Sequence, residues 1–202
     1  MAQARNPKLI RMTQLAILLA LEAILVFTPI GMIVTPVASI TLMHIPVIIG
    51  AILLGPLSGG ILGGAFGVLA MIRATMGGGA IDMLFNPAAS GNPLASIVLS
   101  VVPRILLGLF AAYLYILFRK LFKTDYAAIP VSALLATALH TVMVLGLLWL
   151  LFREAPAMEG FAVMSIFSSV IALNGLLEMG LAVVLSTAIC KPMLKFLGSR
   201  KA

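Results

Sequence analysis

Long apolar stretches separated by short polar or Gly- and Pro-rich stretches dominate the pattern along this chain. A helix needs about 20 consecutive, mostly apolar residues to cross a bilayer. By this criterion the sequence predicts helices at residues 8–27, 42–54, 57–73, 93–118, 128–152 and 161–188. The second segment is short for a complete crossing. The predicted fold class is an all-α integral membrane protein with six transmembrane helices, in which residues 1–202 form a single domain.

The composition excludes a soluble domain. Hydrophobic residues make up 62% of the chain and charged residues only 9%, whereas soluble domains carry roughly 25% charged residues. The single cysteine, Cys190, excludes an internal disulfide. The first apolar segment is longer than the hydrophobic region of a signal peptide and no small-residue cleavage site follows it, so we interpret it as a retained transmembrane helix.

The positions of the basic residues predict the orientation, because cytoplasmic segments carry an excess of Lys and Arg. With the N-terminus inside, Arg73 and Arg153 fall outside and Arg104 lies within a helix. The other ten of the 13 Lys and Arg residues fall inside, namely Arg5, Lys8, Arg11, Arg119, Lys120, Lys123, Lys191, Lys195, Arg200 and Lys201. Both termini are therefore expected to be cytoplasmic. The net charge of +7 is explained by topology and anionic lipid, and no nucleic-acid partner is expected.

The glycine-rich stretch GPLSGGILGGAFG at residues 55–67 does not fit a phosphate-binding loop. Such a loop ends in Lys followed by Ser or Thr, and here the run ends in Phe66, Gly67 and Val68. Gly59, Gly63 and Gly67 recur every four residues instead. This spacing is typical of a small-residue helix face, which lets two backbones approach closely inside a membrane.

Three polar residues in the last three predicted helices lie at a similar depth. Counted from the outer helix ends at ~1.5 Å per residue, Arg104, His140 and Asn174 are all near the middle of the membrane. Glu178 lies one turn beyond Asn174 on the same face. Polar groups are costly in lipid, so their convergence predicts a site among these helices that opens outward. A buried guanidinium suits an anionic solute, because its geometry matches a carboxylate.

Other interpretations of these features remain open. Arg104 and Glu178 could form a buried structural ion pair, with His140 simply hydrogen-bonded. The outer loop at 76–93 is interpreted either as a lid over the site or as an ordinary connector, and the apolar loop at 28–40 as a cap. His44 has no Cys or second His nearby, so no metal site is expected.

Several blocks of this sequence resemble the substrate-binding S components of energy-coupling factor (ECF) vitamin transporters. The block TLMHIPVIIGAILLGPLSGGILGGAFG at residues 41–67 is similar to the second and third helices of that family. GNPL at 91–94 and VVPRILLG at 101–108 resemble the opening of its fourth helix, and the likeness is strongest to the pantothenate S components. The resemblance covers nearly the whole chain.

The resemblance implies a protein without catalytic residues or a cofactor that binds a vitamin from outside. It implies partners as well: a transmembrane coupling subunit and two cytosolic ABC ATPases, in a bacterial or archaeal cell membrane. The family's docking motif of two alanines four residues apart matches Ala16 and Ala20. Only 7% of the residues are aromatic, which favours an aliphatic carboxylate such as pantothenate over a flat ring. Arg104 would then meet the carboxylate, with His140, Asn174, Asn92 and Glu178 around it.

Other functions are also consistent with parts of the sequence. The solute could be another vitamin such as riboflavin, since S components for different vitamins share one scaffold. A small intramembrane enzyme or a passive channel belongs to a different class. The chain contains no Gly-x-Ser-Gly with a histidine partner and no His-Glu-x-x-His motif for the enzyme. An Asn-Pro-Ala triplet at 86–88 is typical of water channels, but no second copy pairs with it.

Overall fold

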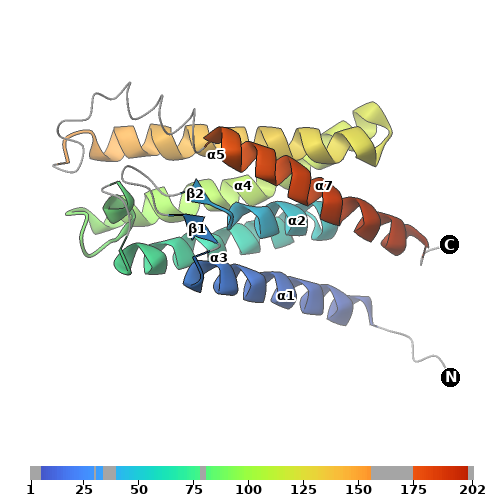
Figure 1. Ribbon diagram of the computed structural model, residues 1–202, viewed down its shortest axis with the longest axis horizontal. Helices are drawn as coiled ribbons and strands as arrows, with labels where there is room; N and C mark the ends of the chain where they lie inside the picture. The colour runs from blue at the N-terminus through green and yellow to red at the C-terminus, as the bar shows by residue number, and fades with distance from the viewer. Residues whose placement is uncertain (1–5, 30, 34–39, 78–80, 156–174, 200–202) are drawn as a thin grey trace.

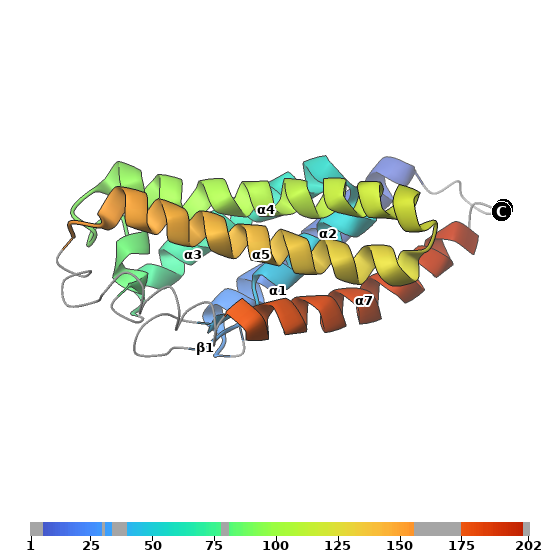
Figure 2. The same cartoon turned by 90° about the horizontal axis from the view of Figure 1, so that it is seen from above.

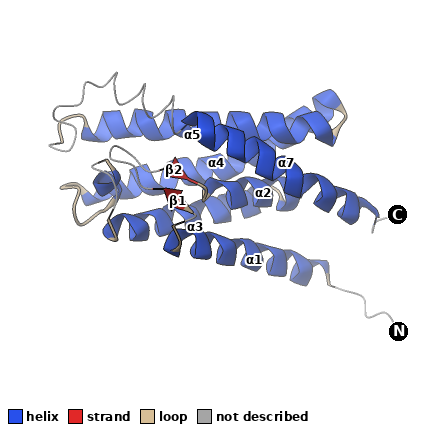
Figure 3. Cartoon of the chain, viewed as in Figure 1, coloured by secondary structure: helices blue, strands red, loops and turns tan. Residues whose placement is uncertain are grey.

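In the part of the chain that the structure describes, five long helices run alongside one another, with a shorter helix between them (Figures 1 and 2). The computed structural model describes residues 6–29, 31–33, 40–77, 81–155 and 175–199. Within these ranges the elements are α1 (Pro7–Phe27), β1 (Met32–Ile33), β2 (Ile40–Thr41), α2 (His44–Leu54), α3 (Pro56–Thr75), the 3-10 helix η1 (Asp82–Phe85), α4 (Pro93–Phe122), α5 (Asp125–Phe152) and α7 (Leu176–Ser199). Helices account for almost all of this structure (Figure 3).

Among the described residues, five helices are long and apolar enough to span a membrane: α1, α3, α4, α5 and α7. The predicted second helix is confirmed as α2, but it has only 11 residues. At ~1.5 Å per residue it would extend across about half of a ~30 Å hydrocarbon core. Its residues from His44 to Ile52 are all buried, as expected for a helix that is apolar all round. α2 is therefore an internal helix, and in the described part of the chain five helices reach spanning length. The total of six transmembrane helices stays a prediction, since residues 156–174 lie outside the described ranges.

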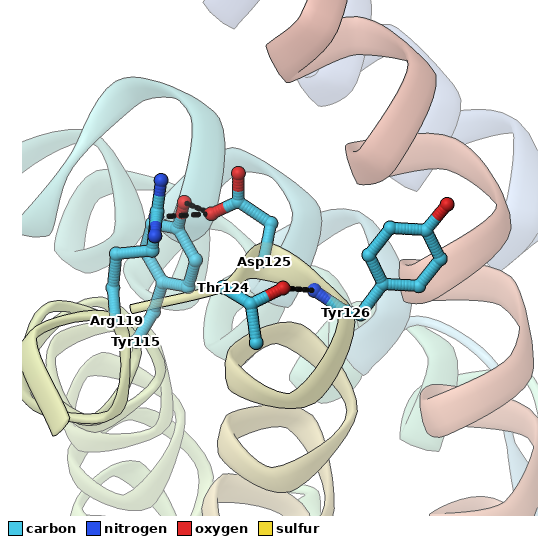
Figure 4. A network of polar contacts seen from close by, with 5 residues as sticks. All are labelled: Tyr115, Arg119, Thr124, Asp125 and Tyr126. Carbon is cyan, nitrogen blue, oxygen red and sulfur yellow. Dashed lines mark hydrogen bonds and ion pairs between the residues drawn. The ribbon is translucent and has the colours of Figure 1, made fainter. Parts of the chain in front are cut away.

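The turn between α4 and α5 is shorter than the sequence predicted. α4 continues to Phe122 and α5 begins at Asp125, whereas we expected the helices to end at 118 and begin at 128. Thr124 caps α5 by accepting a hydrogen bond from the N–H two residues on. The carboxylate of Asp125 pairs with Arg119 at 2.6 Å and accepts a 2.9 Å hydrogen bond from the Tyr115 hydroxyl (Figure 4). These polar contacts let the charged stretch remain helical almost up to the turn.

The C-terminal helix α7 also ends later than expected. The sequence predicted a helix at 161–188; residues 161–174 lie outside the described residues, and α7 runs from Leu176 to Ser199. It continues through Pro192. The ammonium group of Lys191 lies 3.5 Å from the ring centre of Tyr126 on α5, a favourable cation–π contact. Lys191 and Lys195, which lie beyond the predicted helix end, are therefore part of α7.

Both predicted outer loops contain short ordered elements. In the 28–40 loop, β1 pairs antiparallel with β2, so that Met32 lies opposite Thr41. The loop at 76–93 contains η1. Ser96 on α4 donates a 2.7 Å hydrogen bond to the carbonyl oxygen of Leu84, and Ser100 donates a 3.4 Å bond to that of Phe85. These hydroxyl groups hold η1 against the start of α4.

The prediction of a close-packed glycine face on α3 is confirmed. A Cβ atom added at Gly63 would overlap the carbonyl oxygen of Arg104, and one added at Gly59 would lie 2.6 Å from the carbonyl oxygen of Gly108. At Gly67 the nearest atom would be the carbonyl oxygen of Ser100, at 2.8 Å. α3 thus lies directly against the backbone of α4. This contact fixes the height at which Arg104 enters the bundle.

Apart from the buried Arg104, the described basic residues gather at the two ends of the bundle in unequal numbers. The first turn of α1, the α4–α5 turn and the last turns of α7 lie at one end (Figures 1 and 2). This end carries Lys8, Arg11, Arg119, Lys120, Lys123, Lys191 and Lys195. The opposite end carries Arg73, near the end of α3, and Arg153, just after α5.

Candidate functional site

A cavity of about 120 Å³ lies between β2, α3, η1, α4, α5 and α7. Its polar lining comes from Thr41, Asp82, Arg104, His140, Thr141 and Glu178. Phe66, Phe85, Val144, Leu145 and Leu148 are among the residues that form its apolar walls. The sequence predicted a polar site between the last three long helices, and the structure brings Arg104, His140 and Glu178 of that prediction to one cavity.

Arg104 is the cation in the lining of this cavity. Its side chain is buried and its guanidinium carbon lies 4.9 Å from the ring centre of Phe85 and 5.5 Å from that of Phe66. Nη1 donates a 2.6 Å hydrogen bond to the carbonyl oxygen of Leu99. Nε is buried without a hydrogen-bond partner among the described residues. The guanidinium therefore makes cation–π contacts with two aromatic rings and keeps at least one N–H donor unused.

Glu178 lines the same cavity from α7 without forming an ion pair with Arg104. In the part of the chain that the structure describes, ion pairs within 4.0 Å join Arg119 to Asp125 and Arg153 to Glu154. Oε1 of Glu178 instead accepts a 2.7 Å hydrogen bond from the backbone N–H of Thr41. The alternative of a direct Arg104–Glu178 ion pair is thus absent here. Both charges are left facing the cavity.

His140 approaches the cavity from α5, beside the aromatic wall. Its ring centre lies 6.2 Å from that of Phe66. Nε2 is buried and makes no hydrogen bond to any described residue. A neutral imidazole can donate or accept one hydrogen bond at each ring nitrogen, depending on the tautomer. His140 therefore offers a bound molecule one polar contact at the side of the cavity.

The remaining predicted residues lie elsewhere or outside the described ranges. Asn92 is exposed and caps α4, accepting a 3.2 Å hydrogen bond from the N–H of Ala95; it does not line the cavity. Asn174 lies outside the described residues. Ala16 and Ala20 are exposed on α1, where their small side chains leave the helix backbone accessible.

Sequence reasoning missed several cavity residues, including Thr41, Phe66 and Asp82. Asp82 is a single carboxylate in an apolar, glycine-rich loop, and that isolation was the signal available for it. Phe66 lies next to Gly67 on α3, whose glycine face brings it toward α4. No side chains among the described residues form a cluster of three or more His, Cys, Asp or Glu that could hold a metal ion. The lining offers a cation, carboxylates, an imidazole and hydroxyl groups for hydrogen bonding.

The fold and this cavity together define a multi-pass α-helical membrane protein with a polar binding site inside its helix bundle. Residues 10–190 match the family described as "ECF transporter, substrate-specific component". The chain belongs to this family, which confirms the resemblance drawn from the sequence. It is thus a transporter component of the cell membrane.

One relative agrees with the likeness to pantothenate S components that was drawn from the sequence. The pantothenic acid transporter PanT of Lactococcus lactis subsp. cremoris (strain MG1363) is 31% identical over 161 residues. The match covers 77% of this chain and 78% of the relative.

Proposed function

We propose that this chain binds pantothenate at the cavity and delivers it to the cytoplasm as the S component of an ECF importer. The observation that carries the proposal is Arg104, a buried cation that lines the cavity and has no carboxylate within 4.0 Å among the described residues. An uncompensated buried charge is costly, so a site of this kind favours a ligand of opposite charge. The similarity to PanT supports the choice of solute.

Pantothenate carries a carboxylate at one end and hydroxyl groups at the other, joined by an amide. Its carboxylate would bind Arg104, because a guanidinium presents paired N–H donors that match carboxylate geometry. Its hydroxyl and amide groups would meet His140 and the carboxylate of Glu178, which face the same space. Asn174 remains a proposed contributor, and so does Asn92, whose side chain would have to leave its cap at the start of α4 to reach the solute.

The unequal charge of the two ends of the bundle supports an orientation with the N- and C-termini in the cytoplasm. The end that holds the start of α1 and the last turns of α7 carries most of the described basic residues. Cytoplasmic loops favour Lys and Arg. In this orientation the loop with η1 and the β1–β2 pair lie outside, at the side from which solute is captured.

Import against a gradient requires energy from partners. We propose that α1 docks on the transmembrane coupling subunit through Ala16 and Ala20, and that two cytosolic ABC ATPases drive release. Both alanines are exposed, and small residues at this spacing permit close helix approach in lipid.

Binding measurements with the purified protein test the solute directly. Isothermal titration with pantothenate should give a saturable signal, and riboflavin should give none. Mass spectrometry of small molecules that co-purify with the protein should detect pantothenate. If the protein binds riboflavin or another vitamin and ignores pantothenate, the chain remains an S component but the proposed solute is wrong. In proteoliposomes, uptake should require the coupling subunit, the ATPases and ATP together.

A further inference from the structure

A proline inside α4 frees a backbone acceptor next to the key cation of the cavity. Pro103 lies in the interior of α4 and is itself buried. Proline has no N–H, and its ring pushes away the carbonyl of the residue four positions earlier, which here is Leu99. In a membrane such a freed carbonyl must find another donor, because no water is available in the hydrocarbon region.

The donor is the side chain of the next residue. Nη1 of Arg104 lies 2.6 Å from the carbonyl oxygen of Leu99. That bond runs back along the same helix. In a regular helix the acceptor would be occupied by the N–H of residue 103. Because Pro103 has no N–H, the carbonyl oxygen of Leu99 lacks its usual helical donor. The Arg104 guanidinium supplies a donor in its place.

Two aromatic rings contact the guanidinium that makes this bond and restrict its movement. Phe85 of η1 and Phe66 of α3 lie 4.9 Å and 5.5 Å from the guanidinium carbon. Ser100 holds Phe85 in place through its carbonyl oxygen. The guanidinium thus has a tether at Nη1 and cation–π contacts with two rings. A long side chain held in this way loses little conformational entropy when a ligand binds.

We propose that Pro103 is a positioning residue: by freeing the Leu99 carbonyl it holds the Arg104 guanidinium against Phe66 and Phe85, and this preorganisation makes the cavity selective for a carboxylate over an uncharged analogue. The role of Arg104 as the carboxylate ligand rests on the proposed function. The orientation of its side chain by Pro103 does not depend on which solute binds.

The test compares Pro103→Ala with Pro130→Ala. Alanine at 103 restores an N–H that competes with Arg104 for the Leu99 carbonyl. Pro130 is the control, since it also lies inside a long helix, α5, but the residue that follows it, Val131, does not line the cavity as Arg104 does. The quantity measured is the preference for pantothenate over panthenol, in which a hydroxymethyl group replaces the carboxylate. Pro103→Ala should reduce this preference about two- to tenfold, the cost of ordering one long side chain on binding, and Pro130→Ala should leave it unchanged.

A second variant, Phe85→Leu, removes one ring without altering α4. If Phe85 helps to orient the guanidinium, this variant should reduce the preference for pantothenate over panthenol. If the ring contributes only apolar contact, both affinities should fall alike and their ratio should stay constant. Phe85→Leu also decides the question if Pro103→Ala does not fold. An unchanged ratio in a folded Pro103→Ala protein, or in Phe85→Leu if only that variant folds, would overturn the proposal.

Nuclear magnetic resonance without solute separates this proposal from the proposed function. In protein labelled with ¹⁵N-arginine, the signals of the Arg104 guanidinium are identified as those that disappear in the Arg104→Lys variant. The tethered guanidinium should show distinct Nη1 and Nη2 signals because its rotation is hindered, and Pro103→Ala should merge them. If wild-type protein fails to bind pantothenate but shows this change, the solute is wrong and the positioning role stands. Signals that are identical in wild type and Pro103→Ala would refute the positioning role whatever the solute is.

Discussion

The backbone N–H of Thr41 donates a 2.7 Å hydrogen bond to Oε1 of Glu178. The two residues are far apart in sequence, and the bond joins the end of β2 to the first turn of α7. Both residues line the cavity. Glu178 therefore binds the backbone of the segment that precedes α2, and its carboxylate also faces the cavity.

Substitution of Glu178 should separate its structural contact from its charge. Glu178→Gln keeps a carbonyl oxygen for the Thr41 N–H, whereas Glu178→Ala leaves that donor without its partner, at a cost of about 1–3 kcal/mol. We expect a lower melting temperature for Glu178→Ala and a value near wild type for Glu178→Gln. Thermal unfolding in detergent measures both. Equal losses in the two variants would mean that the negative charge, and not the hydrogen bond, stabilises the fold.

Arg104→Ala should weaken pantothenate binding roughly tenfold or more, because a hydrogen bond to a charged group is worth about 1.5–3 kcal/mol. Arg104→Lys keeps the charge but loses the paired donors, so it should bind with intermediate affinity. Arg153→Ala is the matched control: this arginine is exposed and does not line the cavity. Titration calorimetry on all three variants gives the affinities. Wild-type affinity in Arg104→Ala would remove Arg104 from the binding site.

Gly63→Ala should destabilise the bundle. The added Cβ would overlap the carbonyl oxygen of Arg104, and forcing an extra carbon into a packed interface typically costs ~1–3 kcal/mol. Gly64→Ala is the control on the same helix, since its Cβ would make an ordinary 3.7 Å contact with Ile105. Melting temperatures should fall for Gly63→Ala and stay level or rise for Gly64→Ala. Equal melting temperatures for the two would contradict the close α3–α4 contact.

Ala16→Leu and Ala20→Leu should weaken assembly with the coupling subunit while solute binding stays intact. The larger side chains would prevent the close helix approach that small residues permit. Gly146→Leu on α5 is a comparable change at an exposed position, with no atom within 4 Å of its Cβ. Co-purification with the coupling subunit and ATPases measures assembly. Full assembly of both alanine variants would place the docking surface elsewhere on the chain.

Hydropathy and spacing in the sequence were sufficient for the membrane class and the glycine contact of α3, whereas the family was inferred from the resemblance of whole sequence blocks such as residues 41–67. A bilayer imposes long apolar helices, and a small residue every four positions marks one helix face, so both can be inferred from local sequence. The ends of the helices were predicted less accurately than their positions. The extension of α4 to Phe122 depends on the pairing of Arg119 with Asp125 across the turn, which local hydropathy does not record.

The arrangement of the cavity was decided by tertiary structure. The sequence placed Arg104 and His140 at a similar depth because helices have a fixed rise per residue. The sequence did not determine how each helix is rotated about its own axis. It therefore could not show whether Glu178 would pair with Arg104 or with the backbone of Thr41. Nor did it bring Phe85 to the guanidinium, since that contact requires η1 to fold back onto α4. Side-chain partners across helices follow from packing, which sums many weak contacts between segments distant in the chain.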